Sequence, residues 1–250
     1  MNVLYITSPE AYLAKEGENV LVLVEEETKL RIPVHNLEGI VCFGHTGASP
    51  ALMHLCAERN VALSFHSEGG RFLARVTGRT NGNVLLRRKQ YRIADNLEET
   101  LQYAKNFIFG KVYNCRCVLQ RFLRDHGEKG GFPRVDEKIR FLSSQLLKAH
   151  NCQNIAILRG IEGESARAYY SVFDNLILGE KGVFRFEGRS RRPPLDATNA
   201  ILSYLYTMLA HDCTSALETV GLDPQVGFLH RERPGRPSLA LDLMEHSCKS

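Results

Sequence analysis

The sequence contains no run of about 18 consecutive apolar residues, which is the length that a transmembrane helix needs. Its first ten residues, MNVLYITSPE, have neither the basic segment nor the apolar core of a secretion signal. The seven cysteines are an odd number, and no two of them are spaced as C-x-x-C; Cys115 and Cys117 form C-x-C. These absences argue against a membrane protein and a disulfide framework, and they predict a cytoplasmic protein with reduced thiols.

Several catalytic signatures are missing as well. There is no G-x-S-x-G and no dinucleotide-binding glycine fingerprint, and residues 44–47 (GHTG) lack the lysine and the spacing of a phosphate-binding loop. The 250 residues are 44% hydrophobic and 24% charged, which is ordinary for a folded protein of one large or two small domains. The net charge of +4 decides little until the position of the charges is known.

The hydrophobic spacing changes from short apolar runs to a helical period near residue 95. It predicts an α+β fold, with a small β-rich N-terminal domain at 1–80, a basic linker at 81–95 and a larger α-helical domain at 96–250. Ser49 and Asn96 are the expected N-caps of the first helix and of a long second one. The expected strands are 3–6, 11–15, 19–25, 29–32, 39–43, 61–65 and 71–76, and the later helices have apolar stripes over 135–146, 166–177 and 202–220.

One carboxylate falls on an apolar helical stripe. If the third helix of the second domain begins near Ile161, Glu162 shares its face with Tyr169. A carboxylate there costs free energy unless it is paired, hydrogen-bonded or bound to a metal. The alternative is a solvated residue of the first turn that interacts with the helix dipole, and spacing alone favours this alternative.

A second candidate cluster lies near the end of the chain. Ser238 is a possible cap of a short helix on which Asp242 and Glu245 are three residues apart, and His230 comes from the preceding loop. Two neighbouring carboxylates repel each other unless a cation lies between them. With Glu162, these side chains form a mixed histidine and carboxylate set suited to Mn²⁺ or Mg²⁺. The alternative, which spacing again favours, is a surface histidine and a solvated helix face.

Between these clusters lies a basic loop, residues 181–194. Its glycines and prolines predict exposure, and arginine forks pair well with phosphate oxygens, so it is a candidate DNA-binding segment. A solubilising loop is an equal alternative. The basic run in the linker is a similar but weaker candidate. The arginines concerned are Arg185, Arg189, Arg191 and Arg192 in the loop, and Arg87 and Arg88 in the linker.

A zinc site is a weaker interpretation of the N-terminal domain. His54 and Cys56 are two residues apart on an expected helix, so their side chains point in different directions. Together with Cys42 and His45, they are better explained by buried core cysteines and unrelated histidines.

Five segments together resemble a known family. Residues 158–170 (LRGIEGESARAYY), 188–199 (GRSRRPPLDATN) and 221–245 resemble the CRISPR-associated adaptation endonuclease/integrase family, called Cas one. Residues 33–44 and 82–92 also resemble it. The likeness covers nearly the whole chain and is strongest to subtype I-C.

The resemblance implies a metal-dependent DNA endonuclease/integrase that inserts short DNA segments into a CRISPR array. It assigns Glu162, His230 and Glu245 as ligands of Mg²⁺ or Mn²⁺, with Asp242 as the accompanying acidic residue. The metal would act as a Lewis acid on a phosphodiester, and arginines of the loop would neutralise phosphates. The resemblance further implies DNA, a homodimer formed through the β-domain, and the small protein Cas two as partners.

One departure from the family concerns the end of the chain. Family members continue for many tens of residues past the acidic pair, whereas this chain has five residues after Glu245. We therefore expect a C-terminally short copy, in which the last helix has no further helices to pack on and the metal site is poorly formed. The alternative function is then a catalytically silent DNA-binding and dimerisation module.

Overall fold

The computed structural model describes residues 2–78, 83–127, 132–179, 182–191 and 193–247; residues 246 and 247 are described by their backbone only. The chain divides into two compact units, Met1–Asn81 and Gly82–Ser250. The first is rich in strands and the second is helical, so the predicted α+β class is confirmed. No helix in the described ranges is long and apolar enough to cross a membrane.

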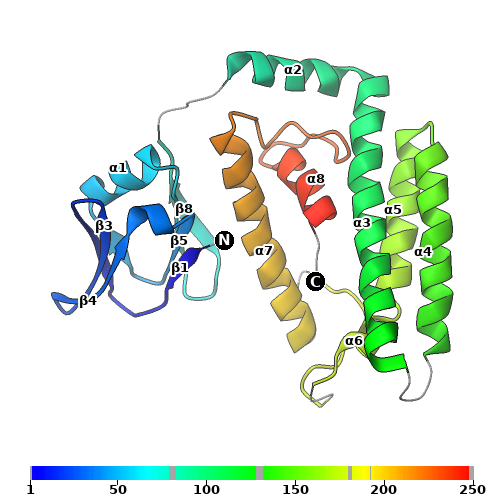
Figure 1. The fold of residues 1–250 in the computed structure, drawn as a ribbon, viewed down its shortest axis with the longest axis horizontal. Helices are drawn as coiled ribbons and strands as arrows, with labels where there is room; N and C mark the ends of the chain where they lie inside the picture. Colours follow the sequence, from blue (N-terminus) through cyan, green and yellow to red (C-terminus); the bar gives the residue numbers. More distant parts are fainter. Residues whose placement is uncertain (1, 79–82, 128–131, 180–181, 192, 248–250) are drawn as a thin grey trace. The chain divides into compact units, whose positions relative to one another are not determined.

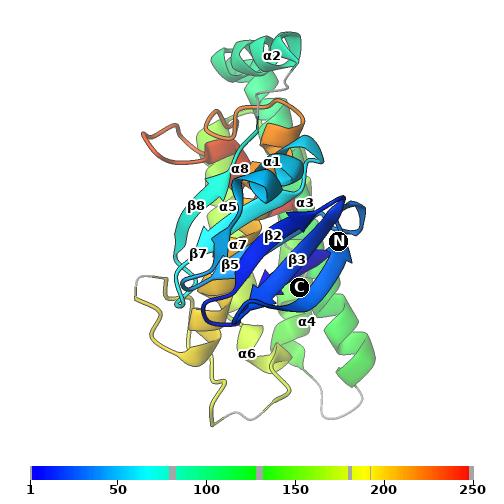
Figure 2. The same ribbon diagram turned by 90° about the vertical axis from the view of Figure 1, so that its left-hand side faces the viewer.

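The first unit contains two four-stranded sheets, with strand orders β1-β5-β7-β8 and β4-β3-β2-β6. In the first sheet β1, β5 and β7 are parallel and β8 is antiparallel; in the second, β2, β3 and β4 are antiparallel (Figure 2). The bounds are β1 Val3–Ile6, β2 Tyr12–Glu16, β3 Asn19–Val24, β4 Glu27–Pro33, β5 Gly39–Phe43, β6 Gly47–Ala48, β7 Ala62–His66 and β8 Phe72–Val76, with the short helix η1 Val34–Asn36 and helix α1 Pro50–Glu58.

Local sequence explains the element ends in this unit. Gly17, at φ +59°, forms the turn between β2 and β3 in a conformation that costs other residues more. The Ser49 hydroxyl accepts a hydrogen bond from the Leu52 amide, so Ser49 caps α1 as predicted. The predicted burial of Cys42 and Cys56 is confirmed. Burial, and repulsion from the nearby Cys56 when both sulfurs ionise, raise the pKa of Cys42 to about 12. Burial raises the pKa of Cys56 to about 11.

The second unit is a helical domain in which α3, α4 and α5 lie side by side (Figure 1). The last helix, α8, packs against both α3 and α7. The expectation that the last helix has nothing to pack on is therefore wrong. The bounds are α2 Val84–Asp95, α3 Leu97–His126, α4 Pro133–Asn151, α5 Ile155–Tyr170, α6 Phe173–Leu176, α7 Ala197–Thr219 and α8 Ser238–Ser247.

Most of the segment predicted as a basic linker is instead helix α2. Asn83 caps its start by accepting hydrogen bonds from two amides. On its inner face the amide nitrogen of the buried Gln90 donates to the carbonyls of Asp223 and Val226, and its oxygen accepts from the Asp223 amide. Gln90 thus satisfies the polar groups of a distant turn and fixes α2 to the segment that leads into α8.

The third predicted helix also differs at both ends. Helix α5 begins at Ile155, six residues earlier than expected, because the Asn154 side chain caps it by accepting from the amides of Ala156 and Ile157. It ends at Tyr170, and the expected continuation is the separate helix α6. Glu162 therefore lies in the interior of α5 and not in its first turn.

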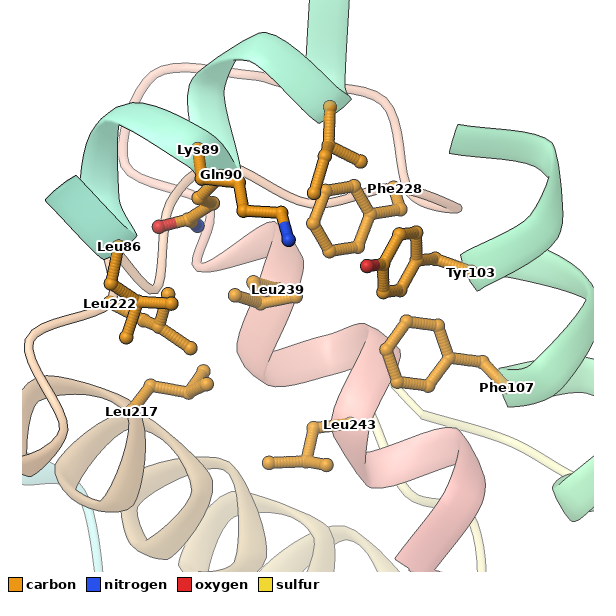
Figure 3. A pocket seen from close by; sticks show the side chains of 11 residues that line it. Leu86, Lys89, Gln90, Tyr103, Phe107, Leu217, Leu222, Phe228, Leu239 and Leu243 are labelled. Carbon is orange, nitrogen blue, oxygen red and sulfur yellow. The ribbon is translucent and has the colours of Figure 1, made fainter. Parts of the chain in front are cut away.

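An apolar pocket of about 330 Å³ lies among α2, α3, α7 and α8 (Figure 3). Leu239 and Leu243 enter it from α8, and Tyr103 and Phe107 enter it from α3. The buried side chains of α8 therefore have partners on several helices, which holds α8 in register against α3.

Candidate active site

Two helices and one loop of the second unit carry the predicted acidic residues and the predicted histidine. Glu162 comes from α5, Asp242 and Glu245 come from α8, and His230 precedes α8. The Glu162 side chain is 27% exposed and the Glu245 side chain 20%. The solvated first-turn alternative for Glu162 is therefore wrong.

The two glutamates meet on one cation, the ammonium of Lys111 on α3. Lys111 Nζ forms ion pairs with Glu162 Oε1 and Glu245 Oε2, and its own side chain is 12% exposed. We call these three residues the Lys111 cluster. The sequence reasoning missed Lys111, which follows the stripe residue Ile108 by three positions and directly precedes Val112. The only signal was a lysine at the edge of an apolar stripe.

Electrostatics in the Lys111 cluster favour the charged lysine. Burial lowers the pKa of Lys111, but the charges of Glu245 and Glu162 and their hydrogen bonds outweigh burial and raise the pKa above its ordinary value. The lysine is therefore an ammonium at any physiological pH, and the cluster carries a formal charge of −1.

Asp242 has a different environment. Its side chain is fully buried, and Oδ2 accepts hydrogen bonds from the amides of Phe228 (2.6 Å) and Leu229 (2.9 Å). Oδ1 lies 3.0 Å from the His230 amide and 2.6 Å from His230 Nδ1. Both oxygens are thus already used in shaping the loop 227–230, which we call the Asp242 loop.

The Asp242 contact also fixes the tautomer of His230. Oδ2 of Asp242 accepts from two backbone amides and Oδ1 accepts from a third. An ionised carboxylate has only acceptor atoms, so Nδ1 of His230 is the donor in their contact. In the neutral imidazole Nε2 then carries the lone pair with which histidine binds metals, and the carboxylate behind it is the usual outer partner of such a ligand. His230 and Glu162 line the same pocket, of about 330 Å³.

Gly227 allows the loop to approach α8 closely. A Cβ atom at this position would lie 2.7 Å from the carbonyl carbon of Ser238 and 2.8 Å from Asp242 Oδ2. Both distances are below normal contact. The absence of a side chain at Gly227 is therefore required for the hydrogen bonds that follow it.

Four arginines line the pocket that contains Glu162 and His230. Arg159 donates from Nε (2.8 Å) and from its terminal nitrogen (2.6 Å) to the Leu229 carbonyl, so α5 holds the Asp242 loop from a second side. Burial and the charge of Arg231 lower the pKa of Arg159, and Asp242 opposes them. The other two arginines are Arg233 and Arg236. This basic rim was not predicted, although the segment 230–236 (HRERPGR) contains three of its four members.

The arginines predicted to bind DNA have unequal surroundings. Arg189 donates to the carbonyl of Ser190 (2.6 Å) and to Asn199 Oδ1 (2.9 Å), and it lies over the ring of Tyr206. These contacts give Arg189 a role in holding the loop onto α7. Arg191 is exposed, and Arg192 lies outside the described residues.

The remaining predicted contacts are on the surface. Arg185 forms an exposed ion pair with Glu187 at 3.1 Å. Arg87 donates to the Gly221 carbonyl at 3.1 Å, whereas Arg88 is exposed. Of the described arginines in the prediction, Arg88, Arg185 and Arg191 are therefore exposed to an incoming phosphate, although Arg185 is paired with Glu187.

The described side chains place no three His, Cys, Asp or Glu residues close enough to hold a metal ion. The cause is visible in the contacts, because Lys111 lies between the two glutamates and Asp242 is committed to its loop. The donor set nevertheless fits a hard divalent cation. Glu162 and Glu245 both reach one positive centre, and His230 shares the pocket of Glu162.

Comparisons with known proteins agree on one family. The family model described as CRISPR associated protein Cas1 matches residues 4–246. A relative named CRISPR-associated endonuclease Cas1 1, from Chlorobaculum tepidum, is 50% identical over 245 residues, which cover 98% of this chain and 71% of the relative. Another, named CRISPR-associated endonuclease Cas1 2, from Rhodospirillum rubrum, is 49% identical over 251 residues, covering 98% and 72%.

Solved structures give the same result for the fold. A Cas1 protein from Thermotoga maritima has a TM-score of 0.79 and 25% identity, covering 99% of this chain and 75% of that one. A casposase bound to integration product has the same TM-score and identity, with coverages of 99% and 69%. The predicted family is confirmed, whereas subtype I-C and the short C-terminus stay predictions. The chain belongs to the CRISPR associated protein Cas1 family.

Proposed function

We propose that this chain is a divalent-metal-dependent DNA endonuclease and integrase that acts in CRISPR adaptation. The observation that carries the proposal is the convergence of Glu162 and Glu245 on a single cationic nitrogen, beside the pocket that contains His230 and four arginines. Carboxylates gathered around one positive charge next to a basic rim suit a metal-bound phosphodiester.

Glu162, Glu245 and His230 would hold the metal, Mg²⁺ or Mn²⁺, which when bound supplies Lewis-acid polarisation of a phosphodiester. Asp242 would not be a ligand, because both its oxygens accept hydrogen bonds from the loop. It would instead keep Nδ1 of His230 protonated and its ring oriented.

The reaction that this site suits is transesterification. The oxygen of an incoming DNA 3′-hydroxyl forms a new bond to phosphorus, the existing bond from phosphorus to a 3′-oxygen breaks, and the proton of the hydroxyl is passed to the leaving oxygen or to solvent. If water attacks in place of the hydroxyl, the same site nicks the strand. Integration and nuclease activity are thus two outcomes of one chemistry.

DNA would approach through the arginine rim. Arg231 and Arg233 are exposed at the pocket, and their forks can pair with phosphate oxygens on either side of the scissile bond. The similarity to a casposase bound to integration product supports a DNA substrate with a joined end. A homodimer, a partner of the Cas two kind and a cytoplasmic location belong to the same proposal and follow from the family.

The test is nicking and strand transfer on a branched DNA, with Mn²⁺ compared with EDTA. Glu162→Ala and His230→Ala are expected to abolish the metal-dependent product while retaining DNA binding. Glu164→Gln is the matched control, because Glu164 is on the same helix but accepts a hydrogen bond from Gln145 and is expected to keep activity. Activity that survives in Glu162→Ala would overturn the site. DNA binding without any metal-dependent product in the unmodified chain would favour the silent binding module.

A further inference from the structure

The ion pairs of the Lys111 cluster conflict with metal binding by its two glutamates, and the family resemblance does not address this conflict. Glu162 and Glu245 are the proposed metal ligands, yet in this structure a lysine ammonium contacts an oxygen of each. An ammonium and a divalent cation repel each other and compete for the same oxygens. Both positive centres therefore cannot occupy the space between these two carboxylates.

We propose that Lys111 is an internal competitor of the divalent cation, whose ammonium must leave Glu162 and Glu245 before the metal binds. The inference rests on the proposed function, because it takes these glutamates as metal ligands. It assigns to Lys111 the role of a positioning residue. In the metal-free protein it keeps two partly buried carboxylates together, and it sets how tightly the metal is held.

The first support for this inference is the charge of the cluster. Two carboxylates alone would present a formal charge of −2 to an incoming cation, but with the ammonium in place they present −1. Because the three side chains are only 12–27% exposed, water screens their interaction less than at the open surface. Removal of one positive charge should therefore strengthen metal binding measurably.

The second support is that the displacement needs only a side-chain movement. Ile108 and Val112, beside Lys111 on the 30-residue helix α3, are fully buried, so the helix backbone is fixed. The lysine stem has several rotatable bonds and can change rotamer without moving α3. Glu162 also lines the open pocket, which gives a hydrated cation a route to the carboxylates.

The experiment measures Mn²⁺ affinity directly, by calorimetry and by the loss of the free Mn²⁺ electron paramagnetic resonance signal, in the full chain without DNA. Lys111→Met keeps the length of the side chain and removes the charge, and we expect it to bind Mn²⁺ about tenfold more tightly. Lys111→Arg keeps the charge, and we expect no gain. Lys105→Met is the matched control, since Lys105 lies on α3 outside the cluster, and we expect its affinity to equal that of the unmodified chain.

The outcomes separate this inference from the proposed function. If Glu162→Ala binds Mn²⁺ as well as the unmodified chain does, the proposed ligand set fails. If Glu162→Ala loses binding but Lys111→Met binds no more tightly than the unmodified chain, the ligand set stands and the competition is overturned. Equal gains in Lys111→Met and Lys111→Arg would also overturn it, because charge would then not be the cause.

A second measurement avoids variants and so does not depend on whether Lys111→Met folds. Reductive methylation modifies accessible lysine amines, and mass spectrometry reports the rate for each peptide. In the metal-free chain we expect Lys111 to react slowly, because it is buried and paired. Addition of Mg²⁺ should accelerate modification of Lys111 several-fold and leave Lys105 unchanged. An unchanged rate at Lys111 under conditions where Mg²⁺ is bound would contradict the displacement.

Discussion

Asp242 and Glu245 lie three residues apart on α8, yet they have opposite surroundings. Asp242 is fully buried, and its oxygens accept from three backbone amides and one imidazole. Glu245 is partly exposed and pairs with the movable ammonium of Lys111. One carboxylate is fixed by neutral donors of its own loop, and the other is held by a charge that can be exchanged.

The different surroundings give the two carboxylates different roles: Asp242 shapes the site, and Glu245 is the proposed ligand of the cation. A carboxylate that satisfies buried amides cannot leave them without exposing unpaired polar groups, which costs more than the bonds themselves contribute. A carboxylate held by an ammonium can exchange that partner for a metal at little structural cost. The Asp242 loop is thus the rigid half of the site, and the Lys111 cluster is the exchangeable half.

The largest expected effect is on protein stability and concerns the Asp242 loop. Asp242→Asn replaces an acceptor oxygen with an amide group that cannot accept, so at least one buried donor of the loop loses its partner. We expect the free energy of unfolding to fall by about 3 kcal/mol, measured by urea denaturation. Glu232→Gln, at an exposed position of the neighbouring loop, is the control and should change it little. Equal stability of the two variants would show that Asp242 does not organise the loop.

Gly227→Ala tests the same half without removing a polar group. The added methyl group would lie 2.7 Å from the Ser238 carbonyl carbon, so either the loop or α8 has to shift. We expect a loss of about 2 kcal/mol in thermal or urea unfolding. Gly163→Ala on α5 meets nothing within 4 Å and should instead stabilise the helix slightly. A stable Gly227→Ala protein would mean that the close approach is not needed.

The smallest expected effect concerns Arg189, which the sequence predicted to bind DNA, and Arg231, which it did not. Arg231→Ala should weaken DNA binding about tenfold. The slope of log affinity against log salt concentration should fall by about one, which corresponds to the loss of one phosphate contact, and the free energy of unfolding should not change. Arg189→Ala should mainly lower stability, because Arg189 holds its loop to Asn199. Fluorescence anisotropy at several salt concentrations, together with urea unfolding, distinguishes the two. The reverse pattern would place the DNA contact in the basic loop and not at the pocket rim.

Local patterns predicted the elements whose signals lie close together in the sequence. Strand β5 at Gly39–Phe43 follows from a short apolar run, and the start of α3 follows from Asn96, whose side chain accepts from the amides of Glu98 and Glu99. The candidate ligands Glu162, His230 and Glu245 were likewise predicted from short local patterns, together with the resemblance. These features depend on neighbours within a few positions.

The features that were missed depend on partners far away in the sequence. Helix α2 looked like a linker because its basic run dominates, whereas its anchoring comes from Gln90 bonds to Asp223 and Val226. Lys111 was not singled out in the sequence, and its two partners come from other helices. The hydrophobic periodicity of α3 carries no information about partners on other helices. Only the folded chain shows that a lysine lies between the proposed ligands.

The most direct test of the account is a crystal structure of the chain soaked in Mn²⁺, with the metal located by its anomalous scattering. We expect one peak in contact with Glu162, Glu245 and His230, with Lys111 withdrawn from both glutamates and the Asp242 loop unchanged. A peak held by Asp242, or a metal bound elsewhere while Lys111 keeps its ion pairs, would contradict the division of the site into a rigid half and an exchangeable half.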